Sequence, residues 1–303
     1  MTIKHIALAT IAVVSALSSG IALSGGDRPT EFSNQGTIGN TRHNLTQRPT
    51  NGSTAINAAL MDPARNDYQQ VCVYCHTPHG ANTNINAPLW NRTVRTTTYT
   101  LYTQQSLSQA ATQPGPNSLT CLSCHDGQTA VDSIVNMPGS GGYNAVLGLN
   151  PTSEVSESLL DAWRGNAGDT SIDHQRLAIG TDSSSCLACH SPSGAFSQAT
   201  DFTAFALGTD LSNDHPVGVK LPAGSDWNEP NATYRNVRFF DKDGDNRPDK
   251  DEIRFYDSGG GFEVECASCH DPHGVPGGGG TFLPTFLRVT ANGSTICMTC
   301  HVK

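Results

Sequence analysis

The sequence predicts a mostly irregular backbone with short α-helices and few short strands, ordered by bound groups rather than by a large aliphatic core. Three observations predict this class. The 303 residues include 30 glycines and 17 prolines, which supply many turns. Few segments keep a helical or alternating apolar period, and only 36% of the residues are hydrophobic. The ten cysteines stand in regularly spaced pairs, a pattern typical of chains whose thiols hold a bound group.

All ten cysteines form CxxC pairs, and a histidine directly follows each pair. In chain order, the first to fifth motifs consist of Cys72, Cys75 and His76; Cys121, Cys124 and His125; Cys186, Cys189 and His190; Cys266, Cys269 and His270; and Cys297, Cys300 and His301. Two thiols at this spacing on a helical turn can reach both vinyl groups of one haem, with the adjacent histidine under the iron. Disulfides, zinc binding and thiol redox chemistry are the alternatives, but none of them requires a histidine after every pair. The motifs therefore predict five covalently attached haem c groups, each on a short helical turn.

Five further histidines match five irons that each need a second axial ligand. Of the 11 histidines, five belong to the motifs and His5 lies in the N-terminal apolar segment. The remaining histidines, predicted as distal haem-iron ligands, are His43, His79, His174, His215 and His273. Open iron does chemistry and closed iron moves electrons, so bis-histidine ligation at every site favours electron transfer. Ligation by Met61 or Met137 is the alternative, and it would raise the reduction potential of that haem.

The first and fourth motifs each continue as CxxCHxPHG, which places a second histidine three residues after the first. His273 shares one short turn with His270, so it cannot reach the far face of the same haem. We therefore expect His273 to ligate a neighbouring haem, and we expect the same of His79, which follows His76. Each of these segments would hold one haem and grip the next, which enforces close haem spacing.

Haem-pair units are predicted at about residues 70–127 and 264–303, because a simple attachment motif follows each CxxCHxPHG segment. A third haem site is predicted between them, at about residues 170–217. The pattern indicates duplication of a haem-pair module rather than a solenoid, which would need more copies. Short strands are predicted at residues 99–104 (YTLYTQ) and 237–240 (VRFF).

An acidic loop at residues 241–252, DKDGDNRPDKDE, predicts a structural Ca²⁺ site. Calcium prefers many oxygen ligands, and the acidic residues recur along this loop at a spacing that suits it. The candidate ligands are Asp241, Asp243, Asp245, Asp249 and Glu252. Asn246 takes the sixth position, where an EF-hand loop has glycine, and asparagine can also adopt the left-handed conformation. A solvated acidic turn is the alternative.

Residues 1–24 are predicted to be a signal peptide, which leaves residues 25–303 as one haem-binding domain. Lys4 supplies the basic start, an apolar run follows, and Ala22-Leu23-Ser24 offers small residues for cleavage near Ser24. A membrane anchor is the alternative, but the apolar run is short for a span and no basic flank follows it. We therefore expect an exported protein, extracellular or at the cell surface, without a membrane span after cleavage. The periplasm is the alternative location, and the formal net charge of −9 argues against a nucleic-acid partner.

The segments CVYCHTPHG, APLWNR, SNDHPVGV, CASCHDPHG and CMTCH together resemble exported multihaem c-type cytochromes with doubled CxxCH motifs, of the OmcE/OmcS type. The resemblance covers residues from about 40 to 303, although five motifs match neither of these two types. It implies an extracellular filament, or nanowire, in which subunits stack head to tail and a histidine of one subunit ligates a haem of the next. By its position, His43 is the candidate for that role, with the haem at His301 as its partner. A heterologous contact that does not close gives such a filament.

The function predicted from these features is electron transfer rather than enzyme catalysis, and no catalytic residue is predicted. The sequence carries no phosphate loop and no CxxCK motif of the kind found at a nitrite-reducing haem. Redox partners or extracellular electron acceptors would complete the path. Two alternatives stay open: a soluble monomeric periplasmic carrier, and a multihaem reductase with one open iron.

Overall fold

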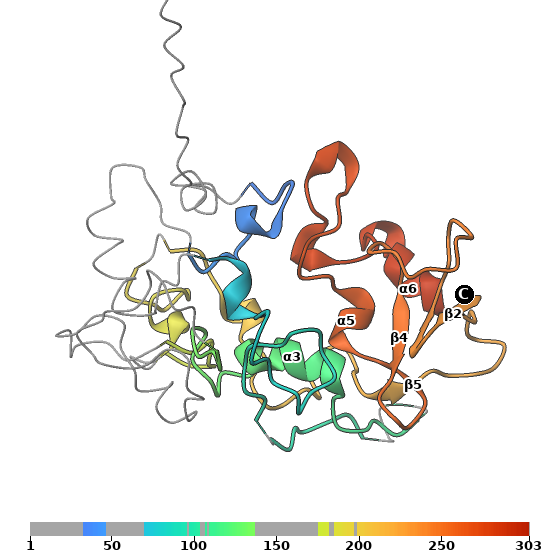
Figure 1. Cartoon of the computed structure of the whole chain (residues 1–303), viewed down its shortest axis with the longest axis horizontal. Coiled ribbons are helices and arrows are strands. Elements are labelled where there is room, and N and C mark those ends of the chain that lie inside the picture. The colour runs from blue at the N-terminus through green and yellow to red at the C-terminus, as the bar shows by residue number, and fades with distance from the viewer. Residues whose placement is uncertain are drawn as a thin grey trace, which may run out of the picture.

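The structure is a computed structural model that describes residues 33–46, 70–95, 97–103, 107, 109–136, 175–181, 185–196 and 199–302. Residues 1–24, predicted as the signal peptide, lie outside the described residues, as do His174, Met61 and Met137. Figure 1 shows the chain as irregular loops around short helices, with strands gathered beside α5 and α6. Among the described residues, no helix has the length and apolar character needed to span a membrane.

The helices are short, and each of the five motifs contributes to one. They are η1 (Ile38–Asn40), η2 (Cys72–Tyr74), α3 (Pro116–His125), η4 (Cys186–Ala188), η5 (Thr203–Phe205), α5 (Cys266–Cys269), η6 (Gly278–Gly280), η7 (Pro284–Phe286), η8 (Asn292–Ser294) and α6 (Thr295–Cys300). The prediction that the attachment motifs lie on short helical turns is confirmed. The ten residues of α3 begin with Pro116 directly after Gly115, a position where the missing N–H of proline costs nothing.

The predicted fold class, mostly irregular coil with few short strands, is wrong in one respect: five strands form one antiparallel sheet. They are β1 (Val219–Lys220), β2 (Ala232–Tyr234), β3 (Val237–Phe239), β4 (Arg254–Asp257) and β5 (Phe262–Val264). Their order in the sheet is β1-β5-β4-β3-β2, and every pairing is antiparallel. The sheet gives the part of the chain before α5 a regular frame that the sequence analysis did not anticipate.

Short strands and tight turns explain why the sheet was missed. Strands of two to four residues are too brief to reveal an alternating pattern. The β2–β3 turn requires φ of +56° at Arg235, without the glycine that usually marks such a hairpin. The acidic loop joins β3 to β4, so a segment interpreted only as a cation loop is also a hairpin connection. Of the two predicted strands, VRFF is confirmed at Val237–Phe239, whereas residues 99–103 make only an isolated bridge from Thr100 to Asp210.

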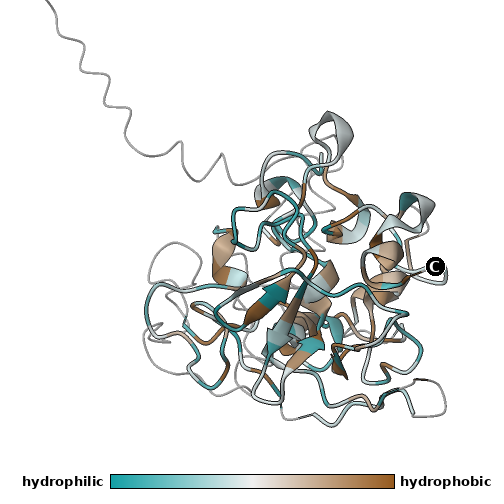
Figure 2. Cartoon of the chain, turned by 90° about the vertical axis from the view of Figure 1, so that its right-hand side faces the viewer, coloured by the Kyte–Doolittle hydropathy of each residue, from teal (hydrophilic) through white to brown (hydrophobic). Residues whose placement is uncertain are grey.

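The described apolar side chains pack in small clusters rather than in one large core. One cluster joins Tyr99, Leu122 and Leu211 around α3. Another joins Ile253, Phe255 and Val289, with Cys269 and Cys300 packed against it. Figure 2 shows the same pattern, since hydrophobic and hydrophilic stretches alternate over short lengths of chain. Cysteines of the fourth and fifth motifs therefore lie at the edge of one apolar cluster.

A buried carboxyl group joins α3 to α5, and so joins the second motif to the fourth. Glu265 accepts a hydrogen bond from the backbone N–H of Gly115 (2.8 Å), and the Ser118 hydroxyl donates to its other oxygen. Ser118 in turn accepts from the N–H of Cys266 at 2.8 Å. Glu265 also forms a capping box with Ser268 at the start of α5. Burial raises the pKa of Glu265 to about 7, and the nearby carboxyl of Glu263 adds to the shift.

Replacing Glu265 with Gln is expected to remove a pH dependence of stability. The pKa of Glu265 is about 7 in the folded state against an ordinary value of 4.5, so the folded chain keeps a proton that the unfolded chain releases. Wild-type stability should therefore fall by about 3 kcal/mol as the pH rises from 4.5 to 7, and stay level above that. Denaturant unfolding of both proteins at several pH values measures this. An equal fall in Glu265→Gln would contradict the prediction.

Candidate haem sites

The five motifs present their thiols in a form suited to covalent attachment. All ten cysteines are free, and each is exposed or partly exposed. In every motif the two cysteines lie on, or directly at the end of, one short helical segment. This placement on one short turn is the one expected where two thiols attach to the same haem.

Four of the five attachment histidines share one contact. The Nδ1 atom of each of these four donates to a backbone carbonyl: His76 to Pro88 (2.8 Å), His125 to Phe205 (2.8 Å), His190 to Thr200 (2.8 Å) and His270 to Thr285 (2.7 Å). A carbonyl oxygen can only accept, so Nδ1 carries the proton and Nε2 keeps its lone pair. Histidines that ligate metals typically have this arrangement, with the second nitrogen fixed by an outer hydrogen bond. Nε2 is therefore the nitrogen available to a haem iron.

In the first and fourth motifs, the carbonyl that accepts from the attachment histidine belongs to the segment that follows the motif and folds back onto it. The two segments pair with their motifs through equivalent backbone hydrogen bonds. In the first, Thr77 N–H donates to Leu89 O (2.9 Å) and Asn91 N–H donates to Cys75 O (2.9 Å). In the fourth, Asp271 N–H donates to Phe286 O (2.8 Å). Arg288 N–H donates to Cys269 O at 2.7 Å, which is the equivalent of the bond from Asn91 to Cys75. The resemblance between the two segments in sequence thus extends to their backbone hydrogen bonds.

The fifth motif is held differently from the other four. Asn228 N–H donates to Cys300 O at 2.8 Å, and the indole ring of Trp227 lies 4.2 Å from the ring of His301. His301 is exposed. The last attachment histidine is thus packed against the segment that connects β1 to β2.

A buried arginine organises the region between the first and second motifs. The Arg92 side chain is fully buried and donates to the carbonyls of Ser123, Ala130, Val131 and Ser133 at 2.8 to 2.9 Å. Its Nε also donates to the Ser123 hydroxyl at 3.2 Å. Ser123 lies inside the second motif, so Arg92 ties that motif to the segment returning from the first. Arg92 ends the segment APLWNR, and nothing in the neighbouring sequence indicates that its side chain is buried.

An unpartnered polar atom beside the first motif also fits a bound group. The indole nitrogen of Trp90 is buried and has no hydrogen-bond partner among the described residues. Trp90 lies against His76, with ring centres 6.0 Å apart and the rings nearly perpendicular. A buried N–H without an acceptor is costly, and haem carries carboxylate groups that could accept it. The donor set and this orphan atom both fit a haem at the first motif.

The predicted distal histidines occupy different surroundings, and His174 lies outside the described residues. His43 faces His125, with ring centres 6.3 Å apart, and its Nδ1 lies 3.3 Å from Pro272 O. Burial, followed by the nearby His125, lowers the pKa of His43 to about 4, so this ring is neutral at pH 7. A neutral imidazole is the form that binds metal.

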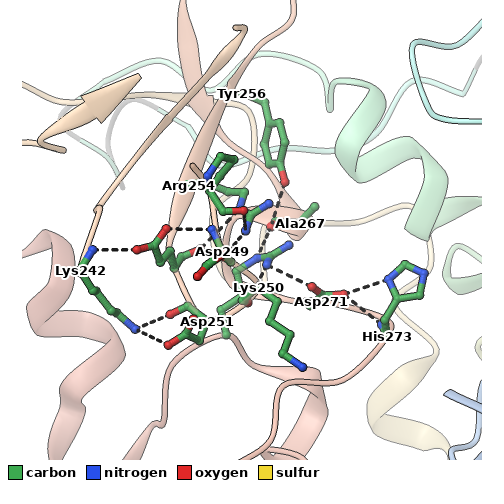
Figure 3. Close-up of polar contacts among 12 residues, drawn as sticks. Lys242, Asp249, Lys250, Asp251, Arg254, Tyr256, Ala267, Asp271 and His273 are labelled. Atoms are coloured by element: carbon green, nitrogen blue, oxygen red, sulfur yellow. Dashed lines mark hydrogen bonds and ion pairs between the residues drawn. The ribbon is translucent and has the colours of Figure 1, made fainter. Parts of the chain in front are cut away.

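His273 faces the attachment histidine of the first motif. Its ring centre lies 6.2 Å from that of His76, and the two rings are within 11° of parallel. Figure 3 shows the Asp271 carboxylate in contact with His273, whose Nδ1 lies 3.1 Å from it. The guanidinium of the buried Arg288 donates to the same carboxylate at 3.2 Å. The hydrogen bond that His273 donates to Asp271 raises the pKa of His273. The sequence analysis did not single out Asp271, since the equivalent position in the first motif is Thr77.

The remaining two distal candidates are exposed. His215 Nδ1 lies 3.2 Å from Pro216 O, and His215 is near enough to His270 to contribute, after burial, to lowering the pKa of His270. His79 is exposed and projects from the first motif, while its own carbonyl accepts from Thr77 at 2.8 Å. The two CxxCHxPHG segments therefore direct their second histidines to different surroundings.

The motifs lie close to one another. Cys121 and Cys266 are in hydrogen-bond contact, which raises the pKa of Cys121. Burial and then Cys124 raise the pKa of Cys75 to about 12, and burial with Cys124 among its neighbours does the same for Cys186. Burial and then Cys300 raise the pKa of Cys269 to about 12. The second motif thus neighbours the first, third and fourth, and the fourth neighbours the fifth.

Three of the five predicted cation ligands come together in the acidic loop. Carboxylate oxygens of Asp241, Asp243 and Glu252 lie within 4.8 Å of one another. Asp245 and Asp249 do not join this group: Asp245 accepts from Arg247 N–H (2.7 Å), and the Asp249 N–H donates to Glu252 (2.8 Å).

The loop is closed by its own hydrogen bonds and ion pairs. Asn246 adopts the left-handed conformation considered from the sequence, with φ of +59°. Figure 3 shows the ammonium group of Lys242 beside Asp251, at 3.5 Å. The backbone N–H of Lys242 donates to the buried Glu252 at 2.7 Å. The loop therefore has the turn that a cation site requires.

Comparison with known families matches residues 260–303 to the doubled CXXCH motif family. This segment contains the fourth and fifth motifs and everything between them. No curated protein matches the chain at the significance required. The match supports a multihaem c-type cytochrome that binds haem covalently, and with it an electron-transfer role.

Proposed function

We propose that the protein conducts electrons through five closely spaced c-type haems with bis-histidine ligation, outside the cell, as the subunit of a head-to-tail filament. The observation that carries the proposal is the proximity of the second and fourth motifs, whose Cys121 and Cys266 thiols are in hydrogen-bond contact. Cys124 of the second motif is also near enough to the first and third motifs to raise the pKa of Cys75 and of Cys186. Haems attached to such neighbouring thiols would be close enough to exchange electrons, and no substrate pocket is needed.

In this function, the protein residues hold the haems and orient their axial ligands. When bound, each haem supplies a reversible one-electron change at its iron. The carbonyls of Pro88, Phe205, Thr200 and Thr285 orient the attachment rings and keep Nε2 free. A second histidine on each iron would exclude small ligands and favour electron transfer over catalysis.

The filament was proposed together with His43 as the ligand that crosses between subunits. The position of His43 next to His125 in the same chain favours the second candidate function, a soluble monomeric periplasmic carrier. A filament can still form if another exposed histidine crosses the subunit boundary. His79 and His301 are both exposed, so a contact between them is open to a neighbouring copy.

Electron microscopy of the haem-containing material exported by the source cells tests the filament. We expect filaments whose repeat contains five haems, with a histidine of one subunit on a haem of the next. Dispersed single particles would overturn the filament and leave the monomeric carrier. A five-coordinate haem that binds carbon monoxide would instead favour the multihaem reductase.

We also propose a structural Ca²⁺ in the acidic loop, supported by the grouping of Asp241, Asp243 and Glu252 and by the left-handed Asn246. The loop connects β3 to β4, so the cation would stabilise the sheet. A ligand present at 100 times its dissociation constant stabilises the folded state by about 2.7 kcal/mol. Chelator is therefore expected to lower the melting temperature by a few degrees, and added Ca²⁺ should restore it.

The matched control for this prediction is the double variant Asp241→Asn, Asp243→Asn. It should already melt at the lower temperature, and chelator should not change it further. Wild-type protein that melts at the same temperature with and without chelator would show that the loop is only a solvated acidic turn.

A further inference from the structure

Two pairs of histidine rings face each other with their ring centres just over 6 Å apart. His76 and His273 have ring centres 6.2 Å apart, and His43 and His125 have ring centres 6.3 Å apart. For comparison, His190 and Phe202 form a true stack, with ring centres at 4.0 Å and planes within 2°. In each of the two pairs, one member is an attachment histidine and the other a predicted distal ligand.

This separation matches the space that one iron needs. With metal–nitrogen bonds of about 2 Å and a nitrogen about 1 Å from each ring centre, two imidazoles on opposite sides of a metal have centres about 6 Å apart. The pairs differ in ring orientation, with interplanar angles of 11° and 89°. Both orientations are compatible with axial ligation, because each ring can rotate about its own metal–nitrogen bond.

All four rings have Nδ1 occupied by an outer partner. The attachment rings donate to Pro88 O and Phe205 O, both at 2.8 Å. His273 Nδ1 is held by Asp271 at 3.1 Å and His43 Nδ1 by Pro272 O at 3.3 Å. These contacts leave Nε2 as the free nitrogen of each ring, which is the arrangement of metal-bound histidine.

One turn of the chain supports both distal rings. Asp271 contacts the ring of His273, and the carbonyl of the next residue, Pro272, contacts the ring of His43. Asp271 is itself held by the buried Arg288, which also donates to Ala267 O at 2.9 Å. The turn after the fourth motif is therefore built to place ligands at the first and second motifs.

We infer that His76 and His273 are the two axial ligands of the haem attached at Cys72 and Cys75, and that His125 and His43 are those of the haem attached at Cys121 and Cys124. The inference rests on the proposed haem binding. It makes the haems of the first and fourth motifs neighbours, because His270 and His273 lie on one turn. It also assigns His43 to its own subunit, so the histidine that crosses a filament contact must be another.

Spin state measured in two backgrounds tests the first pair. In the intact chain, His273→Ala should convert one of five low-spin haems to high spin in low-temperature paramagnetic resonance. In a Cys72→Ala, Cys75→Ala background, which lacks the first haem, the same His273→Ala change should convert none of the remaining four. Conversion of one haem in both backgrounds would show that His273 ligates a different iron, and it would overturn the pairing.

The second pair is tested in dilute, monomeric protein. Wild-type monomer should keep the second haem low-spin, and His43→Ala should convert one haem to high spin. If dilution alone produced a high-spin haem and His43→Ala added none, His43 would be an inter-subunit ligand and this pairing would be wrong. A density map of the wild-type protein, in which the two rings flanking each iron are visible, decides both pairs even if a variant fails to fold.

The number of attached haems, measured by intact mass, distinguishes failure of the ring pairing from failure of the proposed function. Five attached haems with other ring pairs would overturn the pairing and leave the proposed function intact. A chain that matures without covalent haem would overturn both.

Discussion

Replacing Arg92 with Met is expected to lower the free energy of unfolding by about 4 kcal/mol, because several buried acceptors lose their donor at once. The guanidinium satisfies the carbonyls of Ser123, Ala130, Val131 and Ser133, and the site excludes the water that could replace it. Methionine fills much of the same volume, so the loss measures hydrogen bonding more than packing. Denaturant unfolding followed by far-ultraviolet circular dichroism gives the value.

An exposed arginine provides the matched control for this substitution. Arg235 lies in the β2–β3 turn, where its guanidinium only covers the ring of Tyr234 at 5.4 Å. Arg235→Met should change stability by about 0.5 kcal/mol or less. Equal effects of the two substitutions would mean that the hydrogen bonds from Arg92 to backbone carbonyls do not stabilise the fold.

Removing the attachment thiols of the second motif, by Cys121→Ala and Cys124→Ala, is expected to abolish both folding yield and electron conduction. This motif neighbours the first, third and fourth, and α3 carries the residues that Arg92 and Glu265 hold. Loss of its haem would therefore leave a gap at the centre of the array.

The comparison is Cys297→Ala with Cys300→Ala, which removes the haem of the fifth motif. This motif is partly exposed and neighbours only the fourth among the contacts described here. The variant should accumulate as a folded four-haem protein. Yields of the two double variants, measured by haem absorbance in the exported fraction, test the difference, and similar yields would contradict a central role for the second motif.

The sequence predicted the short helical turn at each motif well because that feature is local. Two thiols and a histidine within five residues define an attachment site without reference to the rest of the chain, and all five lie on short helical segments. The left-handed Asn246 in the acidic loop was also accessible from local rules. The separate roles of Asp245 and Asp249 were not, because they depend on how the loop closes on Glu252.

Contacts between distant segments were beyond the sequence. The partner of His43 is a carbonyl 229 positions away, and no spacing rule connects them. Glu265 and Arg92 are ordinary charged residues in the sequence, and only their burial reveals that each joins one motif to another part of the chain. The sheet was missed for a related reason, since strands of two to four residues take their order from pairing rather than from their own pattern.

The most direct test of the account is to alkylate the unfolded, exported protein and to measure its intact mass. The account predicts a mass increased by five haems and no alkylated cysteine, because all ten thiols are consumed in thioether bonds. A chain with ten alkylated thiols and no haem would contradict the central claim that these motifs hold covalent haem.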